Sequence, residues 1–439
     1  MLKKSAESLK RINYKLYFSL LFLGLCPTIY TTVRIFFLGQ LPGDWAYSIA
    51  GQLSWVNLLY EILNEAIILP LFFFAGQVIK DRKEFTNRIK TGLAVTGGIY
   101  LLFSLVIIFL AEPLLQWMAA DRSIVPESAT YIRIESIANI FSILCSFTLV
   151  ALVAMEKHRD VYILTILRLI LSILCDTFLI SSLPVSLNCG VNGIGYSNII
   201  VHIVIFVGSL LLLSREGLPI FSKSKLSFHW IRQFAKIGGI SGLESFVRNL
   251  AYILMISRMV NVVGEQGVYW VANSFIWGWL LLPVTQLGEL IKQETAADSK
   301  NVRRNSLGYF EITAAICVLW LNTIPLWKPF MRNVLGYSDI DKLFHLVLIL
   351  LGFYVLYAFQ NVFDATFYGL GKTNYMLFES VVTNTIYYGG AFILYITGTW
   401  IPTLTGIALL FGIGMAFDSL VSLGAYVHLL RNGKKTFSE

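Results

Sequence analysis

Apolar runs long enough to cross a lipid bilayer recur along the whole chain. A membrane-spanning helix needs about 20 predominantly apolar residues, and the sequence predicts twelve of them. The predicted spans are residues 16–38, 46–75, 92–112, 131–155, 161–182, 192–214, 234–262, 267–291, 307–327, 343–368, 375–396 and 403–429. Charged residues make up only 14% of the 439 residues, whereas soluble domains contain about 25%. We therefore expect an all-α polytopic membrane protein with almost no soluble mass.

Lysines and arginines indicate on which side of the membrane each loop lies. The termini and the even-numbered loops carry Lys3, Lys4, Lys10, Arg11, Lys15, Lys80, Arg82, Lys83, Arg88, Lys90, Lys157, Arg159, Arg215, Lys223, Lys225, Arg232, Lys236, Lys292, Lys300, Arg303, Arg304, Lys372, Arg431, Lys434 and Lys435. The odd-numbered loops carry Arg122, Lys328, Arg332 and Lys342. Because cytoplasmic loops are enriched in basic residues, both termini are predicted to be cytoplasmic.

The net charge of +8 is accordingly a topology signal and not a sign of nucleic-acid binding. The expected partners are the lipid bilayer and a small amphipathic molecule or lipid, with no nucleic acid. The expected location is the plasma membrane, in particular the inner membrane of a bacterium. The five cysteines are scattered and odd in number, and they show neither a disulfide framework nor metal-ligand spacing.

Two apolar stretches resemble each other across the chain. Gly24–Leu38 reads GLCPTIYTTVRIFFL and Gly238–Tyr252 reads GGISGLESFVRNLAY. The match is loose, but it aligns Gly24 with Gly238 and Arg34 with Arg248. A charge inside an apolar span, placed at matching points of two halves, suggests a duplicated membrane bundle with a polar site between the copies.

The longest basic connection divides the predicted spans into two sets of six. We expect an N-terminal lobe over residues 1–214, a basic cytoplasmic linker over 215–233 and a C-terminal lobe over 234–439. Six spans per lobe give both lobes the same orientation, which predicts a pseudo-twofold axis along the membrane normal. This organisation favours a secondary transporter that works by alternating access. Three prolines, Pro27, Pro70 and Pro283, are expected to bend their helices.

Several segments resemble the multidrug and toxin extrusion (MATE) family of the MOP flippase superfamily. They are LRLILSILCDTFLI and SLNCGVNGIGYSNII in the fifth and sixth spans, GGISGLES at Gly238, YGLGKTNY at Tyr368 and YIRIESIANI at Tyr131. The resemblance implies a two-lobed antiporter that exports organic, often cationic, molecules in exchange for sodium or protons. It also matches Asp176 with an aspartate of the family's fifth helix. At two positions this chain departs from the family, because Arg34 and Arg248 stand where members often carry an acid.

The two arginines admit two interpretations. An arginine at the centre of a membrane helix costs about 2.5–3.5 kcal/mol on insertion scales, so a function is one explanation: Arg34 and Arg248 bind a substrate in a central cleft. The other is structural, with Glu244 pairing with Arg248 at i,i+4 and Arg34 reaching the outer interface. The expected cleft residues are Arg34, Arg248, Glu244, Tyr30, Asn57 and Gln286.

Acidic residues inside the spans are the candidates for coupling to a cation. Asp176 is one, through the resemblance. Glu61 and Glu65 lie at i,i+4 in the second span, where two carboxylates repel each other. They need a shared proton, a cation or an arginine partner such as Arg34 or Arg248. The sequence therefore predicts no cofactor other than a coupling ion, Na⁺ or H⁺.

Two other functions were weighed against the exporter. A flippase for lipid-linked oligosaccharides or other lipids would use a cationic cleft, because two arginines suit a pyrophosphate headgroup. The chain lacks the extra C-terminal spans expected of a lipid groove. A membrane enzyme is disfavoured because the sequence shows no nucleotide-binding glycine loop, no paired histidine and acid in one loop and no metal-ligand spacing.

Overall fold

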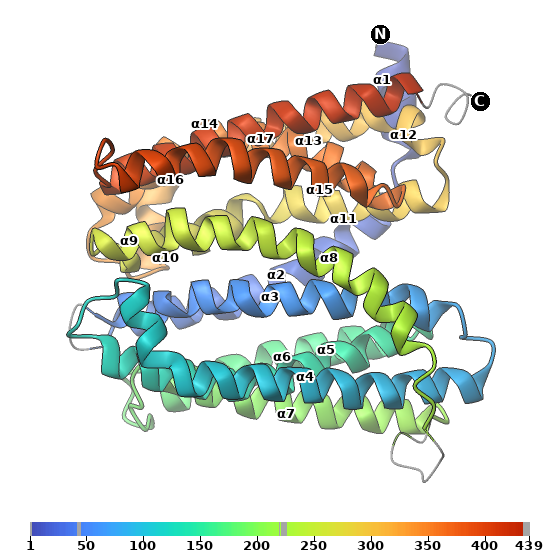
Figure 1. Cartoon of the computed structure of the whole chain (residues 1–439), viewed down its shortest axis with the longest axis horizontal. Helices are drawn as coiled ribbons and strands as arrows, with labels where there is room; N and C mark the ends of the chain where they lie inside the picture. The colour runs from blue at the N-terminus through green and yellow to red at the C-terminus, as the bar shows by residue number, and fades with distance from the viewer. Residues whose placement is uncertain (1, 42–44, 219, 221–225, 433–439) are drawn as a thin grey trace. The chain divides into compact units, whose positions relative to one another are not determined.

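The computed structural model describes residues 2–41, 45–218, 220 and 226–432 (Figure 1). In this part of the chain the regular structure is helical, with no strand. The predicted linker 215–233 lies partly outside the described residues, as do Lys223, Lys225, Lys434 and Lys435. The expected all-α class is confirmed.

The helices of the first half match the first six predicted spans. They are α2 (Tyr14–Leu38), α3 (Ala46–Gly76), α4 (Arg82–Trp117), α5 (Val125–Ala154), α6 (His158–Leu179) and α7 (Asn192–Arg215), preceded by a short helix α1 (Leu2–Arg11) that was not expected. α4 begins ten residues before the predicted start at residue 92. Asp81 caps it by accepting hydrogen bonds from the backbone N–H groups of Lys83 and Glu84, so the helix continues beyond the apolar run.

The second half contains three helices that are interrupted by π-helical turns (η). The elements are α8 (Ile231–Tyr252), η1 (Ile253–Ser257), α9 (Arg258–Val262), α10 (Gln266–Phe275), η2 (Ile276–Leu280), α11 (Leu282–Ala297), α12 (Asn301–Arg304), α13 (Ser306–Asn333), α14 (Ile340–Gly369), α15 (Thr373–Val382), η3 (Thr383–Tyr388), α16 (Gly389–Ile396) and α17 (Leu404–Asn432). The six predicted spans of this half fall on α8–α9, α10–α11, α13, α14, α15–α16 and α17.

By length and apolarity, eight helices of the described residues pass as membrane spans, or nine with α10–α11 taken as one. That pair is bent by 53° at the break between Leu280 and Leu282. Pro283 lies in the first turn of α11, so the bend expected at this proline is confirmed. Large apolar side chains such as Phe109, 77% exposed, lie on the surface. Such exposure is expected for a surface in contact with lipid.

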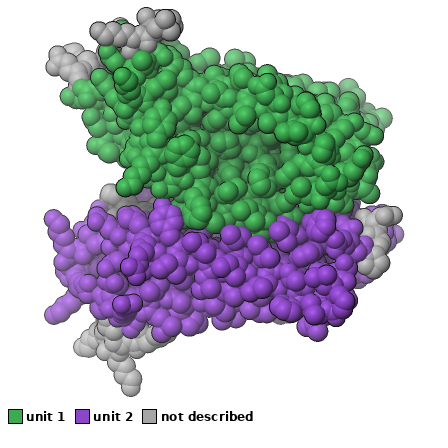
Figure 2. Space-filling view, turned by 180° about the vertical axis from the view of Figure 1, so that it is seen from behind, with its two compact units in different colours: residues 1–32, 268–439 green, residues 33–267 purple. Residues whose placement is uncertain are grey.

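By contacts the chain divides into two compact units (Figure 2). Unit 1 comprises Met1–Thr32 and Val268–Glu439, and unit 2 comprises Val33–Gly267. This division follows from which residues contact each other, and it does not test whether the two halves of the chain repeat one another. The predicted lobes 1–214 and 234–439 therefore stay a prediction.

Each of the two aligned glycines packs against another helix of its own unit. In unit 1, a Cβ atom on Gly24 of α2 would lie 2.6 Å from Leu282 Cδ1 of α11. In unit 2, a Cβ atom on Gly238 of α8 would lie 2.1 Å from the Ala66 carbonyl oxygen of α3. The first predicted span thus meets the eighth, and the seventh meets the second.

Candidate functional site

The buried end of α2 carries an ion pair inside unit 2. Arg34 Nε donates to Asp176 Oδ2 of α6 at 2.9 Å, and Arg34 Nη2 donates to Asp176 Oδ1 at 3.1 Å. Arg34 is 8% exposed and Asp176 is 0% exposed. The two parallel hydrogen bonds are the geometry in which guanidinium matches carboxylate best. A residue expected to hold substrate and one expected to couple transport therefore neutralise each other.

The network continues from this pair to α5. Arg34 Nη2 also donates to Asn198 Oδ1 of α7 at 3.1 Å, and Asn198 Nδ2 donates to Glu135 Oε1 of α5 at 2.8 Å. The side chain of Tyr131 also interacts with Glu135. We call Arg34, Asp176, Asn198 and Glu135 the closed cluster. It contains two carboxyl groups and one guanidinium, and both Glu135 and Asp176 are buried.

A second cluster joins α3 and α8, also within unit 2. Arg248 Nη2 lies 2.7 Å from Glu65 Oε1 and 3.6 Å from Glu61 Oε1, while Arg248 Nε lies 3.5 Å from Glu244 Oε1. The side chains of Arg248 and Glu61 are 43% and 39% exposed. We call these four residues the open cluster, because Arg248, Glu61 and Glu65 are partly exposed. Three carboxyl groups surround one guanidinium here.

The contacts bear on the structural interpretation of the two arginines, and their role in binding a substrate stays a prediction. The expectation that Arg34 reaches the outer interface is wrong, because its guanidinium is buried against Asp176. The expected i,i+4 pair of Glu244 with Arg248 is present. Of the two arginines expected as partners for Glu61 and Glu65, Arg248 is the one in contact.

The remaining predicted cleft residues are spread over both units. Asn57 is exposed on α3 of unit 2. Tyr30 and Gln286 belong to unit 1, where Gln286 packs close to Gly24. The structure brings neither of these two into the closed or the open cluster, and their role in binding stays a prediction.

Sequence reasoning missed Glu135, although YIRIESIANI was noticed for its resemblance. The available signal was an acid within an apolar span. Arg133, two residues earlier, looks like its natural neighbour, but Arg133 pairs with Glu112 of α4 at 2.9 Å. That pair is exposed, whereas Glu135 points into the buried network.

A further acidic group lies in unit 1. Asp418 of α17 accepts hydrogen bonds from Gln360 Nε2 and from Thr383 Oγ1, both at 2.6 Å. Asp364 of α14 accepts one from Ser422 Oγ at 2.7 Å. The buried Glu379 of α15 interacts with both aspartates. Glu379 and Asp418 were not singled out in the sequence, because an acid alone does not reveal which helices meet.

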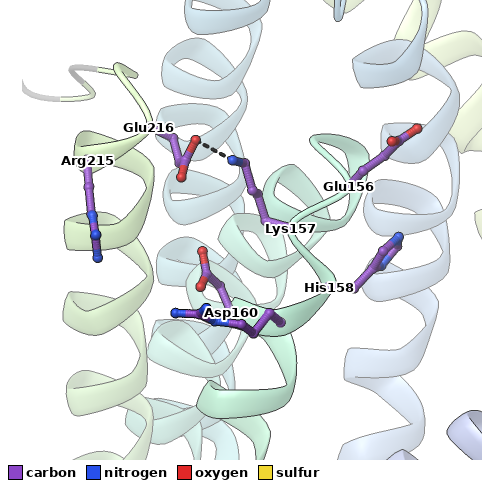
Figure 3. A pocket seen from close by; sticks show the side chains of 7 residues that line it. Glu156, Lys157, His158, Asp160, Arg215 and Glu216 are labelled. Carbon is purple, nitrogen blue, oxygen red and sulfur yellow. Dashed lines mark ion pairs between the residues drawn. The ribbon is translucent and has the colours of Figure 1, made fainter.

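A pocket of about 310 Å³ lies at the junction of α5, α6 and α7 in unit 2 (Figure 3). It is lined by Glu156, Lys157, His158, Arg159, Asp160, Arg215 and Glu216. Lys157 Nζ lies 2.6 Å from Glu216 Oε2, and this hydrogen bond lowers the pKa of Glu216. Acids and bases are balanced in the lining, so the pocket shows no preference for one sign of charge.

Comparison with known proteins finds one matching family model and several solved structures with a similar fold. Residues 74–179 match the family model MatE. No curated protein matches the sequence. A solved multidrug resistance MATE family transporter of the MOP superfamily is similar in its inward-facing conformation, with a TM-score of 0.76, 18% identity and coverage of 93% of this chain and 96% of that one.

Two other solved structures are similar over nearly their whole length. An outward-facing conformation of a multidrug resistance MATE family transporter has a TM-score of 0.71 at 17% identity, covering 96% of each chain. A MOP superfamily transporter from Pyrococcus furiosus, described as having reverse polarity of its binding pocket, has a TM-score of 0.72 at 17% identity, covering 98% of each chain.

The likeness to these solved transporters shows the fold of the chain, and eight or nine helices of the described residues are long and apolar enough to span a membrane. The MatE family model matches residues 74–179, and the chain shares its fold with solved MATE family transporters. Solved proteins of this fold are described in inward-facing and outward-facing conformations. These are the two states that alternating access requires.

Proposed function

We propose that this protein is a cation-coupled antiporter that exports amphipathic organic molecules and prefers cationic ones. The observation that carries this proposal is the excess of carboxyl groups over guanidinium groups in both clusters of unit 2. Each arginine that the sequence offered to an anionic substrate already has carboxylate partners. An anion would have to displace them, whereas a cation meets unused negative charge.

The open cluster is the better candidate for contact with substrate. Three of its side chains, Arg248, Glu61 and Glu65, are partly exposed, and Glu61 and Glu65 share one arginine. An organic cation that approaches these carboxylates competes with Arg248 for them. A proton or sodium ion bound to Glu61 or Glu65 would occupy the same carboxylates. It would therefore lower the affinity for a cationic substrate, which exchange requires.

Asp176 is proposed as a coupling residue that acts through Arg34. Its carboxylate is the main partner of the Arg34 guanidinium. Any change in the charge of the closed cluster therefore changes how firmly α2 is held to α6. In an antiporter this link would favour one conformation of α2 when a cation is bound and another when it is released.

The alternative is a flippase with a cationic cleft, and the contacts disfavour it. Both guanidinium groups that would hold a pyrophosphate are occupied by carboxylates. The Pyrococcus furiosus protein shows by its description that pocket polarity varies within this fold. Pocket polarity must therefore be judged from each chain's own residues, and here carboxylates predominate.

Transport in proteoliposomes tests the proposal. An amphipathic cationic dye such as ethidium is compared with a fluorescent lipid pyrophosphate, under an imposed proton or sodium gradient. We expect gradient-driven movement of the dye, reduced at least tenfold in Glu61→Gln/Glu65→Gln. The matched control is Glu112→Gln, which removes an exposed carboxylate of the same unit and should transport normally. Movement of the pyrophosphate lipid without movement of the dye would favour the flippase.

A further inference from the structure

Every side chain that lines the pocket at the junction of α5, α6 and α7 is ionisable (Figure 3). Three are acidic and three are basic, and His158 is the seventh. The volume of about 310 Å³ lies at the lower end of the range of about 300–1,000 Å³ that small-molecule sites occupy. The pocket therefore suits a small group that carries a positive and a negative charge together.

One wall of the pocket is fixed by contacts within unit 2. Lys157 Nζ lies 2.6 Å from Glu216 Oε2. Arg82 Nη1 of α4 donates to the carbonyl oxygen of Glu216 at 2.7 Å. The end of α7 is thus held to the beginnings of α6 and α4, and the charges of Lys157 and Glu216 compensate each other.

Two arginines and two acids of the lining are left for a ligand. Arg159, Arg215 and Glu156 are exposed, and Asp160 is partly buried. In the part of the chain that the structure describes, none of the four forms a salt bridge. A guanidinium binds phosphate through paired hydrogen bonds, whereas a carboxylate accepts hydrogen bonds from a primary ammonium. The four side chains therefore offer partners for both ends of a zwitterion.

Glu156 lies at a position where the backbone favours glycine. Its φ is 59°, in the left-handed region that is unfavourable for a residue with a Cβ atom. The turn between α5 and α6 is closed by backbone groups, since the N–H of Glu156 donates to the carbonyl oxygen of Val153 at 2.9 Å. The turn itself therefore does not account for a carboxylate at this position, which points to a use for its charge.

An apolar stripe exposed to lipid begins one helical turn from each arginine, Arg159 on α6 and Arg215 on α7. The exposed side chains of the two stripes are Ile163, Ile166 and Ile170 on α6 and Leu211 and Val207 on α7. The two helices touch, because a Cβ atom on Gly208 of α7 would lie 3.3 Å from Leu164 Cδ2 of α6. The acyl chains of a lipid whose headgroup occupies the pocket can therefore lie along both helices.

We propose that this pocket binds the headgroup of a zwitterionic phospholipid with a primary ammonium, the phosphatidylethanolamine class. Arg159 and Arg215 bind its phosphate, and Glu156 and Asp160 accept hydrogen bonds from its ammonium. Phosphatidylcholine has no N–H group to donate, and an anionic lipid brings a charge that the two carboxylates repel. The basic residues of the adjoining loops predict that the lipid belongs to the cytoplasmic leaflet.

Native mass spectrometry of the purified full-length protein tests the proposal without a transport assay. The protein, freed of lipid in detergent, receives equal amounts of phosphatidylethanolamine, phosphatidylcholine and phosphatidylglycerol with identical acyl chains. We expect phosphatidylethanolamine to be retained about tenfold over the other two, because only its headgroup supplies the charge-assisted hydrogen bonds of a primary ammonium beside a phosphate.

Two charge-neutralising variants should change this preference in different ways. Glu156→Gln/Asp160→Asn leaves the two arginines uncompensated and should bind phosphatidylglycerol in preference to phosphatidylethanolamine. Arg159→Gln/Arg215→Gln removes the groups that bind phosphate and should lose retention of both lipids.

Glu156→Gly separates binding from folding. Glycine suits the left-handed backbone, so the melting temperature should stay the same or rise, whereas the preference for phosphatidylethanolamine should fall. The matched control is Glu112→Gln/Arg133→Gln, which removes an exposed ion pair of the same unit and should keep the preference.

Any of four results would overturn the proposal. They are equal retention of phosphatidylethanolamine and phosphatidylcholine, a wild-type preference for phosphatidylglycerol, an unchanged preference in Glu156→Gly, and displacement of the lipid by an equal concentration of soluble phosphoethanolamine. The last result would make a free zwitterion the ligand, since the apolar stripes would contribute nothing. None of these measurements depends on the proposed antiport, so the two can fail separately.

Discussion

At the scale of single residues, the two arginines show how burial changes what an ion pair contributes. Arg34 and Asp176 are almost completely buried, and each charge is stabilised by the other. Arg248, Glu61 and Glu65 remain partly exposed, whereas Glu244 is buried, so solvent and mobile ions screen the first three. We therefore expect removal of one partner to lower the free energy of unfolding more for Arg34 and Asp176 than for Arg248.

Replacing Arg34 by leucine should destabilise the protein by about 3–5 kcal/mol, because Asp176 is left as an unpaired buried charge. The double variant Arg34→Leu/Asp176→Leu should recover much of this loss, since neither charge remains at the pair. The measurement is the free energy of unfolding in detergent for both single variants and the double variant. Additive losses in the double variant would contradict the pairing.

Replacing Arg248 by glutamine should lower the free energy of unfolding by only about 1 kcal/mol, less than Arg34→Leu, because Arg248, Glu61 and Glu65 are partly exposed. The variant should nevertheless alter the affinity for cationic dyes, because Glu61 and Glu65 lose their shared partner. Unfolding and dye binding are measured on the same preparation. A loss of stability as large as that of Arg34→Leu would show that the open cluster is structural.

Much of the residue-scale picture could be predicted from the sequence, but not the pairing. A charge within an apolar run is visible in the sequence and identified Arg34 and Arg248, whereas Asp176 was identified through the family resemblance. The partner of Arg34 lies 142 positions away on another helix, and no local pattern indicates that distance. Glu135 also lies within an apolar span, but only the packing of α5 against α7 brings it to Asn198.

At the scale of helices, close contact between α3 and α8 depends on a glycine. The Cβ of an alanine at position 238 would lie 2.1 Å from a backbone oxygen of α3, and a backbone atom cannot move aside as a flexible side chain can. At the next position, Gly239, an added Cβ would meet nothing within 4 Å. The two neighbouring glycines therefore form a matched pair for experiment.

Gly238→Ala should destabilise the protein by about 1–3 kcal/mol, the typical cost of overpacking a close contact. Gly239→Ala should be neutral or stabilising by up to about 1 kcal/mol, because alanine is the better helix former. Thermal unfolding in detergent compares the two variants directly. Equal effects of both substitutions would mean that α8 does not lie against α3 as the structure shows.

Span positions could be read from the sequence because the bilayer requires a minimum apolar length, and all twelve predictions fall on helices. Helix ends were less predictable, because α4 extends through polar residues to its cap at Asp81. The π-helical turns η1, η2 and η3 could not be predicted. They depend on how neighbouring helices pack and not on a local residue pattern.

At the scale of the whole molecule, the distribution of basic residues predicts orientation. The loop between α6 and α7 is expected outside and contains the partly exposed Cys189, while Ala297 at the exposed end of α11 is expected inside. In the described residues three of the other cysteines, Cys26, Cys145 and Cys317, are buried. Labelling from one side of the membrane can therefore test orientation.

A membrane-impermeant maleimide should label the wild-type protein in right-side-out vesicles, and Cys189→Ser should lose this labelling. Adding Ala297→Cys to the Cys189→Ser variant should restore labelling only after the vesicles are permeabilised. Labelling of residue 297 in sealed vesicles would reverse the predicted orientation and place both termini outside.

The central claim is that excess carboxyl groups in unit 2 exchange a coupling cation for a cationic substrate. The most direct test records pH inside proteoliposomes that contain a trapped pH dye while an amphipathic cation is added outside, with and without sodium. Proton coupling predicts a luminal pH change that accompanies substrate movement and disappears in Glu61→Gln/Glu65→Gln/Asp176→Asn. Substrate movement that is unchanged in this triple variant and independent of both proton and sodium gradients would contradict the claim.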